Sequence, residues 1–502
     1  MNFKTTLTLF AIMFFNWTLI AQDYRYTETL FSSSVITDNV VYGTAPFIND
    51  PYDIENNTTV DDLKMDIYLP QGDTNANRPA IIFAHAGGFI LGNKNHDDMM
   101  AFCDSLSKKG YVTATIDYRQ GFNLISNANL HSIRAVYRGF QDGRTAIRYM
   151  RANADTFGID PGKIYFVGSS AGSFIGLHSI YLNDSSEIPA ETGVVNYTNL
   201  TYPFNHTTPD LGALDIGDNL SYNGEPDAVV SLWGAIQNTD LISPDNDKPV
   251  LLVHGEDDLI VPFEIGYPFS YPVLDDVYGS NEINSRLDNL GLTNKDTYFV
   301  PGEGHEFYGV INGNWSNGVG GNAYWDIIFD KITNFLWLQH KPIANFDYSN
   351  NGLTVNFTDL SVTAISWLWD FGDGTTGTDQ SPSHTYAVEG NYDVKLYIEN
   401  DILSWDEITK TIELKILSLN DNVQLDFSYY PNPANDIINF TFEKTYPLIT
   451  LKLYNLSGQL IRESEFLNSS QVEFKLNDLP QNVYLMKVEK DNKLFSLKVV
   501  KN

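Results

Sequence analysis

Between residues 61 and 341, short apolar runs alternate with longer segments in which apolar residues recur at intervals of three and four. The short runs are rich in Val, Ile and aromatic residues, which favour strands, whereas the longer segments have the periodicity of amphipathic helices. The predicted strands are Pro79–Ala84, Tyr111–Asp117, Lys163–Gly168, Ala228–Trp233, Pro249–His254 and Thr297–Val300, and the predicted helices are Asp97–Lys109, His131–Asn153, Ala171–Leu182 and Tyr324–Gln339. This alternation predicts an α/β fold with a doubly wound, mostly parallel sheet and helices on both of its faces.

After Lys341 the helical periodicity ends, and Gly, Asn, Asp and Ser separate short alternating strands as far as Asn502. This pattern predicts all-β structure. A polar stretch at Ser418–Val423 divides it into two blocks. We therefore expect an α/β domain over residues 22–341, followed by two small β-sandwich domains over residues 342–416 and 425–502.

The first 21 residues have the pattern of a cleavable signal peptide, with a cation at Lys4, the apolar run Leu9–Phe15 and a small residue at Ala21. A membrane anchor is the alternative, but it needs about 20 apolar residues, and Asn16 and Thr18 interrupt the run. Elsewhere the sequence has no segment that approaches a membrane span. We expect an exported protein with no membrane span in the mature chain.

Charge and cysteine content exclude several classes of function. The chain has 63 acidic and 31 basic residues, a formal net charge of −32, which argues against a nucleic-acid partner because phosphate binding needs clustered Lys and Arg. Its single cysteine, Cys103, excludes an intramolecular disulfide and a cysteine-rich zinc site. The histidine spacings HxxxH and HExxH do not occur, so we expect neither a metal nor another cofactor.

The strongest chemical signal is the sequence Gly168-Ser169-Ser170-Ala171-Gly172, which lies between a predicted strand and a predicted helix. A G-x-S-x-G turn in this context presents its serine hydroxyl at the positive end of the helix, and small neighbours permit the tight turn. Ser170 is therefore the predicted nucleophile. Ser169 is interpreted as a small residue that the turn requires.

A serine nucleophile needs a general base and a group that orients that base. Both types of residue follow later strands, with Glu256, Asp257 and Asp258 after one strand and His305 after another. The carboxyl ends of parallel strands form the edge at which open α/β sheets bind ligands. The chain order of serine, carboxylate and histidine is the order of the α/β-hydrolases.

An earlier predicted strand ends in His85-Ala86-Gly87-Gly88-Phe89, where adjacent glycines let the backbone approach a bound group closely. The amides of Gly87, Gly88 and Ala171 are candidate donors to the oxyanion of a tetrahedral intermediate. The alternative reading of these glycines is a simple turn that leaves the strand.

With these motifs, residues 61–341 resemble the α/β-hydrolase superfamily, and within it the carboxylesterases and lipases that carry an HGGG motif. The resemblance implies Ser170 as nucleophile, His305 as base and Asp258 as the acid, in the stretch HGEDDLIVP. Asp257 and Glu256 compete for the acid position. The motif HGGG is HAGG here, with Ala86 in place of one glycine.

Two aromatic segments, residues 264–280 and 306–324, directly follow the acid and base motifs. Their aromatic faces are suited to stacking on sugar rings, phenolic acyl groups or apolar chains, although they are equally suited to packing within the loops themselves. The candidate substrate-binding residues are Phe89, Tyr267, Tyr271, Tyr308 and Trp315. Residues 191–226 form either a cap or a surface excursion.

The two C-terminal blocks resemble known modules. The first contains Trp369-Asp370-Phe371-Gly372-Asp373-Gly374 and resembles a PKD domain, in which the tryptophan packs the core and the carboxylates form turns rather than bind calcium. The last block contains the sequences YPNPA and LYNLSG and is similar to type IX secretion sorting domains, with a carbohydrate-binding sandwich as the alternative. This resemblance implies a secreted or cell-surface protein of a Gram-negative bacterium, with the type IX machinery as a partner.

The predicted function is that of a secreted serine carboxylic-ester hydrolase that acts through an acyl-enzyme. Its substrates are expected to be acetyl or feruloyl esters of extracellular polysaccharide. The alternatives are a lipase or broad esterase, a serine peptidase, and a catalytically decayed hydrolase fold that serves adhesion or glycan binding.

Overall fold

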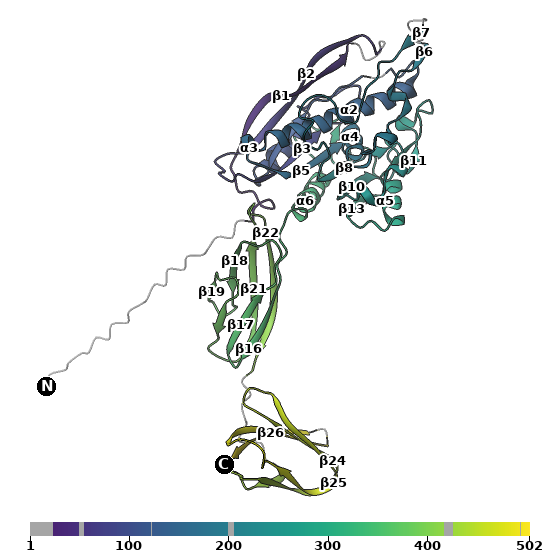
Figure 1. Ribbon diagram of the computed structural model, residues 1–502. Helices are drawn as coiled ribbons and strands as arrows, with labels where there is room; N and C mark the ends of the chain where they lie inside the picture. Colours follow the sequence, from purple (N-terminus) through teal and green to yellow (C-terminus); the bar gives the residue numbers. More distant parts are fainter. Residues whose placement is uncertain (1–23, 50–54, 122, 199–204, 416–424, 492) are drawn as a thin grey trace, which may run out of the picture. The chain divides into compact units, whose positions relative to one another are not determined.

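The computed structural model describes residues 24–49, 55–121, 123–198, 205–415, 425–491 and 493–502; the predicted signal peptide lies outside the described residues. The N-terminal domain contains an eight-stranded sheet in the order β1-β2-β4-β3-β5-β8-β10-β13. Strands β4, β3, β5, β8, β10 and β13 are mutually parallel. At one edge β2 pairs antiparallel with β4, and β1 pairs antiparallel with β2 (Figure 1). The strands are β1 (Ser34–Ile48), β2 (Thr58–Pro70), β3 (Arg78–Ala84), β4 (Val112–Ile116), β5 (Ile159–Ser169), β8 (Ala228–Leu232), β10 (Val250–Gly255) and β13 (Lys295–Val300).

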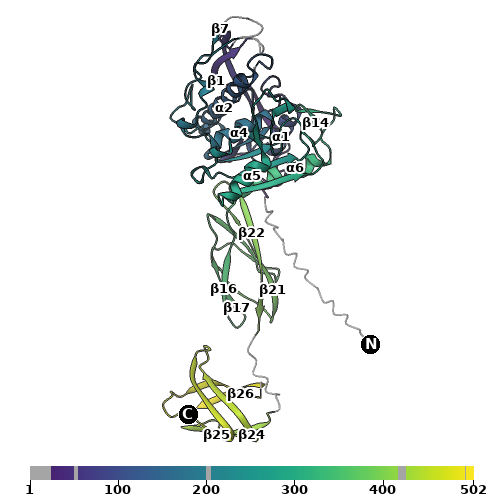
Figure 2. The same cartoon turned by 90° about the vertical axis from the view of Figure 1, so that its right-hand side faces the viewer.

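Helices cover both faces of this sheet (Figure 2). Because successive strand residues point to opposite faces, Ile82 packs in the core with α2 (Ala128–Ala152), α4 (Ala171–Tyr181) and α5 (Ser280–Asn289). Its neighbours Ile81 and Phe83 pack in a second core with α1 (Asp97–Ser107) and α6 (Ala323–Leu338). The predicted doubly wound, mostly parallel sheet is confirmed.

The carboxyl ends of β3, β5, β10 and β13 lie at the same edge of the sheet because these strands are parallel and their ends are in register. Ala84 pairs with Gly168 between β3 and β5, and Gly255 pairs with Val300 between β10 and β13. The chain leaves these strands into the loops that carry the HAGG, GSSAG, GEDD and GEGH sequences. All four candidate motifs therefore start from one edge.

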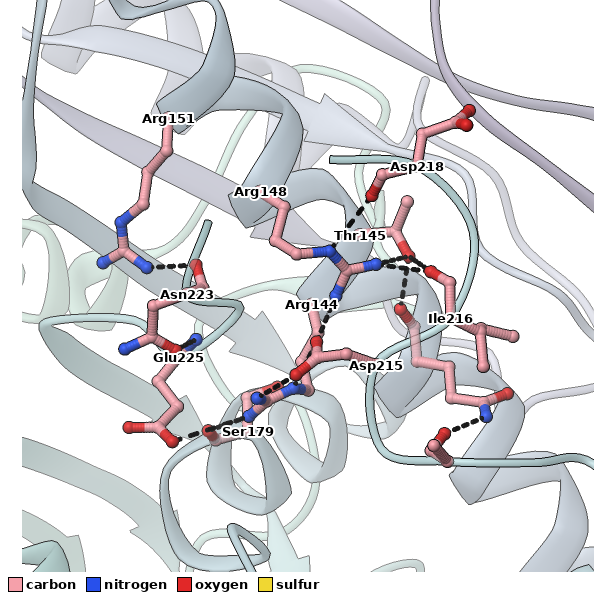
Figure 3. Close-up of polar contacts among 12 residues, drawn as sticks. Arg144, Thr145, Arg148, Arg151, Ser179, Asp215, Ile216, Asp218, Asn223 and Glu225 are labelled. Carbon is pink, nitrogen blue, oxygen red and sulfur yellow. Dashed lines mark hydrogen bonds and ion pairs between the residues drawn. The ribbon is translucent and has the colours of Figure 1, made fainter. Parts of the chain in front are cut away.

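The long segment between α4 and β8 is attached to α2 by arginine side chains (Figure 3). Arg144 and Arg148 both pair with Asp215, and Arg148 also donates to the carbonyl oxygens of Ile216 and Asp218. Arg151 donates to the carbonyl of Asn223. Carbonyl groups of an irregular segment need donors when they are removed from water, and α2 supplies them.

Arg134, closer to the start of α2, is fully buried and donates to the carbonyl oxygens of Glu191, Gly193 and Pro209. The described parts of residues 191–226, which the sequence left open as a cap or an excursion, are therefore fixed along α2 rather than hinged above the sheet edge. Of the described residues between 191 and 226, Glu191 alone lines the cavity described below, beside Leu182, Glu187 and Pro189, which precede the segment.

The described chain beyond residue 341 contains strands and no α-helix, as predicted. Within residues 346–414, Trp369 is fully buried and packs against Phe346, while Asp370 and Asp373 accept hydrogen bonds from the amides of Gly372 and Thr375. These side chains therefore form turns. The strands here are β16 (Phe346–Asn351), β17 (Thr354–Asp359), β18 (Ser366–Asp370), β19 (Thr376–Gly377), β20 (Ser383–Thr385), β21 (Gly390–Glu399) and β22 (Trp405–Leu414).

The last part of the chain forms one five-stranded sheet with its own apolar core. Its order is β23-β24-β26-β27, and β25 pairs with β24. The strands are β23 (Phe427–Tyr430), β24 (Ile437–Tyr454), β25 (Leu460–Lys475), β26 (Asn482–Lys490) and β27 (Lys493–Lys501). Across the residues that the structure describes, no helix combines the length and the apolar character needed to cross a bilayer.

Candidate active site

Ser170 lies in the sharp turn between β5 and α4. Its backbone has φ 52° and ψ −113°, a conformation that residues with side chains rarely adopt. The amide of Ser170 donates to the carbonyl of Leu232 in the adjacent strand, at 3.0 Å. A Cβ atom on Gly172 would lie 2.1 Å from the carbonyl oxygen of Ala84, so only glycine allows α4 to start this close to β3. The small residues of the motif thus hold the serine at the start of α4.

The structure brings together the three residues predicted to carry the chemistry. His305 Nε2 lies 2.9 Å from Ser170 Oγ, and His305 Nδ1 lies 2.7 Å from Asp258 Oδ2. Each residue comes from a loop that follows a different strand of the parallel sheet. In this arrangement one ring nitrogen can accept the hydroxyl proton while the carboxylate fixes the orientation of the ring. The competing carboxylates, Glu256 and Asp257, are exposed.

Asp258 is surrounded by hydrogen-bond donors. The amides of Ile260 and Val261 donate to its Oδ1 at 2.8 and 3.0 Å, and His254 Nε2 lies 3.2 Å from Oδ2, which also contacts His305. Burial by itself would raise the pKa of Asp258, but the hydrogen bonds from His254 and His305 and their positive potential lower it well below the usual value. The carboxylate is therefore charged at neutral pH.

His254 also contributes to the site, although the motifs did not single it out. Its Nε2 lies 3.0 Å from the carbonyl oxygen of Val261, which can only accept, so Nε2 carries the hydrogen. Its Nδ1 then accepts from the Ser280 hydroxyl at 2.8 Å. The same Nε2–H points between Val261 and Asp258, so this buried histidine helps to fix the carboxylate. No sequence signal distinguishes this role, because it depends on the approach of Ser280 from another element.

The backbone beside Ser170 provides candidate oxyanion donors. The amides of Gly87, Gly88 and Ala171 donate to no partner among the described residues. Gly87 has φ 130°, and a Cβ atom there would lie 1.8 Å from the Leu91 carbonyl oxygen. The backbone of Ala86 does not have a positive φ. Alanine therefore fits at the position where the HGGG motif has its first glycine.

A cavity of about 350 Å³ opens beside Ser170, and its lining includes Gly88, Ala171 and Phe89. Its walls are largely apolar, with Val136, Phe174, Leu241 and Val261 among the lining residues, and four carboxylates also line it, from Glu187, Glu191, Asp275 and Asp276. No Lys or Arg occurs among the described residues that line it.

Of the five aromatic residues predicted to bind substrate, the structure brings only Phe89 to this cavity. Tyr267 and Tyr271 lie on the loop after Asp258, where they are 43 % and 39 % exposed, and they do not line the cavity. Tyr308 is fully buried, and Trp315 packs edge-on against Trp325. Phe269, from the same loop as Tyr267, does line it.

Comparison with known protein families identifies three matching stretches of the chain. Residues 65–270 match the BD-FAE family, residues 339–416 match the PKD domain family, and residues 428–502 match the secretion system C-terminal sorting domain. The N-terminal domain is an esterase-type α/β-hydrolase domain. The PKD and sorting-domain resemblances are likewise confirmed, so the chain carries a type IX sorting domain, and the protein is secreted or displayed on the surface of a Gram-negative cell.

Individual relatives are similar over short stretches. Carboxylesterase 3B of Mus musculus is 31% identical over 128 residues, which are 25% of this chain and 21% of that protein. The neuroligin-like protein glit-1 of Caenorhabditis elegans is 34% identical over 138 residues, 27% of this chain and 18% of that protein. The chain thus spans about a fifth of the length of these relatives. The solved structure of Thermogutta terrifontis esterase 2 phosphoramylated by tabun is 17% identical, with a TM-score of 0.38 and coverage of 63% of this chain and 97% of that one.

A buried polar network of the hydrolase domain lies directly behind the nucleophile. Trp233 Nε1 donates to Ser169 Oγ at 3.0 Å, and Tyr308 stacks on Trp233 and donates to Asp98 Oδ2 at 2.5 Å. Trp233 also packs against the ring of His305. Ser169 is therefore a hydrogen-bond partner as well as a small residue, and Tyr308 belongs to this network.

Asp98 gives this network a pH dependence. Burial raises its pKa to about 8, an effect that the nearby Glu306 and Asp97 increase and the hydrogen bonds from Tyr308 and the Met99 amide reduce. Between the ordinary value of 3.8 and about 8, the carboxyl is protonated only in the folded protein, so this group makes stability fall as the pH rises. The slope is at most about 1.4 kcal/mol per pH unit.

Replacing Asp98 by Asn should therefore flatten the dependence of stability on pH. Urea unfolding at several pH values between 5 and 8 measures this dependence. As the pH rises, the free energy of unfolding of Asp98→Asn should increase relative to that of the wild type. Parallel profiles for the two proteins would contradict a protonated carboxyl at this position.

Proposed function

We propose that the hydrolase domain is a serine carboxylic-ester hydrolase that works through an acyl-enzyme. The observation that carries this proposal is the continuous chain from Ser170 Oγ through the His305 ring to Asp258, with separations of 2.9 and 2.7 Å. Free amides beside the serine support it, because ester hydrolysis develops negative charge on the substrate carbonyl oxygen.

In the first half of the proposed reaction, His305 Nε2 takes the proton of Ser170 as Oγ forms a bond to the ester carbonyl carbon. The amides of Gly87, Gly88 and Ala171 then donate to the oxyanion, and each such donor is typically worth about 10²- to 10³-fold in rate. When the tetrahedral intermediate collapses, the bond to the alcohol oxygen breaks and His305 gives its proton to the departing alcohol.

In the second half, water attacks the acyl-enzyme while His305 takes its proton, and that proton returns to Ser170 as the carboxylic acid leaves. Asp258 stays ionised throughout and stabilises the imidazolium that forms in both halves. The hydrogen bonds from the Ile260 and Val261 amides hold the carboxylate in place between turnovers.

The cavity supports uncharged acyl groups as substrates, including the acetyl and feruloyl esters of extracellular polysaccharide. Its volume of about 350 Å³ exceeds the roughly 150 Å³ that accommodates a benzene molecule in a protein core. Carboxylates line it without a basic partner, so an anionic acyl group would be repelled. Export and the PKD module support a substrate outside the cell.

We further propose cleavage of the signal peptide after residue 21 and domains over residues 22–341, 342–416 and 425–502.

Labelling with a fluorophosphonate probe tests the proposed function. The probe needs an activated serine, so the purified protein should form a covalent adduct, and peptide mass mapping should place it on Ser170. The protein should then hydrolyse p-nitrophenyl acetate, and a panel of acetylated xylan, feruloyl esters and long-chain esters would separate a polysaccharide esterase from a lipase or broad esterase.

An unlabelled protein that hydrolyses no ester would contradict the proposal. If such a protein still bound glycan, the decayed adhesive form of the fold would be the better description. Labelling at a residue other than Ser170 would show that the nucleophile is wrong even though the protein is a serine hydrolase.

A further inference from the structure

Phe269 occupies an unusual position at the edge of the cavity. It adopts φ 57° and is followed by Ser270 at φ 53°, so two successive residues with side chains lie in the left-handed region. Their conformation is held by the acid loop, because the Phe269 amide donates to the Ile260 carbonyl at 2.7 Å and the Ser270 hydroxyl donates to the Leu259 carbonyl at 3.1 Å. Strain that the surrounding structure maintains in this way is concentrated at functional sites.

The strained backbone directs the Phe269 ring onto Gly88. A Cβ atom built on Gly88 would lie 2.8 Å from Phe269 Cζ, so the tip of the ring rests against this glycine. Gly88 carries one of the candidate oxyanion amides, and both residues line the cavity beside Ser170. Phe269 is nevertheless 41 % exposed. This partly exposed apolar ring lies beside the expected position of the substrate carbonyl group, so a bound substrate can cover it.

The position of His305 indicates which part of the ester enters the cavity. His305 must lie within hydrogen-bond reach of the leaving alcohol oxygen to protonate it. The ring of His305 contacts Ser170, but His305 is not among the residues that line the cavity. The alcohol therefore leaves on the His305 side of the serine, and the acyl group extends into the cavity past Gly88.

We propose that the cavity is the acyl-binding pocket and that Phe269 is a specificity-determining residue that packs its ring against apolar acyl groups larger than acetyl. This inference rests on the proposed serine hydrolase function. Acyl groups that carry a ring or a chain of several carbons reach beyond Gly88 and cover the exposed face of Phe269. An acetyl group is too short to contact that face.

The test compares p-nitrophenyl acetate with p-nitrophenyl 3-phenylpropanoate, which share one leaving group. Phe269→Ala should lower kcat/KM for the phenylpropanoate by about tenfold, mainly through KM, because the lost contact is apolar burial of the acyl group. Turnover of the acetate should fall much less than turnover of the phenylpropanoate, and thermal unfolding followed by circular dichroism shows whether the variant folds. Phe269→Leu should restore most of the phenylpropanoate activity.

Ile265→Ala is the matched control, since Ile265 is an exposed apolar residue four positions before Phe269, in the short strand β11 (Ile265–Gly266), and does not line the cavity. Its ratio of kcat/KM for the two esters should equal that of the wild type. If Phe269→Ala folds and its ratio of phenylpropanoate to acetate kcat/KM is unchanged or increased, the role of Phe269 is overturned while the hydrolase function stands. Failure of the wild type to hydrolyse either ester would instead contradict the proposed function.

Discussion

Replacing Ser170 by Ala should reduce kcat for p-nitrophenyl acetate by about 10⁶-fold, the loss typical of a serine hydrolase without its nucleophile. The oxygen removed is the atom that contacts His305 Nε2, at 2.9 Å. The alanine keeps the Cβ atom and the backbone of the turn, including the hydrogen bond from the residue 170 amide to Leu232. The loss should therefore come from chemistry and not from unfolding.

Two measurements separate these causes. Thermal unfolding of Ser170→Ala, followed by circular dichroism, should match the wild type within a few degrees, and the fluorophosphonate adduct should disappear. Turnover close to that of the wild type in a correctly folded variant would move the nucleophile to another residue. Residual activity above the uncatalysed rate is compatible with the proposal, because the oxyanion donors and the pocket remain.

The sequence predicted the central sheet well because buried parallel strands have a simple signature. Runs such as Ala80–Ala84 are apolar at every position, since both faces of the strand are covered by helices. The motifs follow these strands directly, so their convergence at one edge was predictable from topology alone. The chain order then indicated the carboxylates at residues 256–258 and His305, and the family resemblance of the stretch HGEDDLIVP singled out Asp258.

The elements that the sequence did not predict lack this signature. Most of the first half of β1 and of the first half of β2 is exposed, including Val35, Val41 and Val60, so their apolar residues do not form a core pattern. Helix α5 buries only Ser280, Ile283 and Leu287 and is otherwise polar. Its periodicity is too weak to detect against the surrounding loop sequence.

The substrate-facing residues were the least predictable part of the site. Tyr267, Phe269 and Tyr271 alternate with other residues in one segment, and residue type alone does not show which of them faces the substrate. Only Phe269 reaches the cavity, because its positive φ turns the ring toward Gly88. No residue type in the sequence signals that conformation, since glycine or asparagine would be expected there.

Replacing Asp258 by Asn should lower kcat by about 10⁴-fold, through the orientation of His305. An Asn side chain can direct an N–H at His305 Nδ1, which favours the tautomer whose Nε2 carries a hydrogen and cannot accept the proton of Ser170. The variant also loses the negative charge that stabilises the imidazolium. Esterase assays at saturating substrate measure the effect, and the fluorophosphonate reaction should slow in proportion.

Asp257→Asn is the matched comparison, because it makes the same chemical change at the adjacent, exposed residue that competes for the acid position in the sequence. Its kcat should stay near that of the wild type, and a large loss of kcat in Asp257→Asn would transfer the acid role to Asp257.

The lowered pKa of Asp258 adds an independent check on stability. Its charged form stabilises the fold above the ordinary carboxyl value of 3.8, and this contribution is lost as the pH falls below that value. The wild type should therefore lose its stability advantage over Asp258→Asn as the pH is lowered into the acid range.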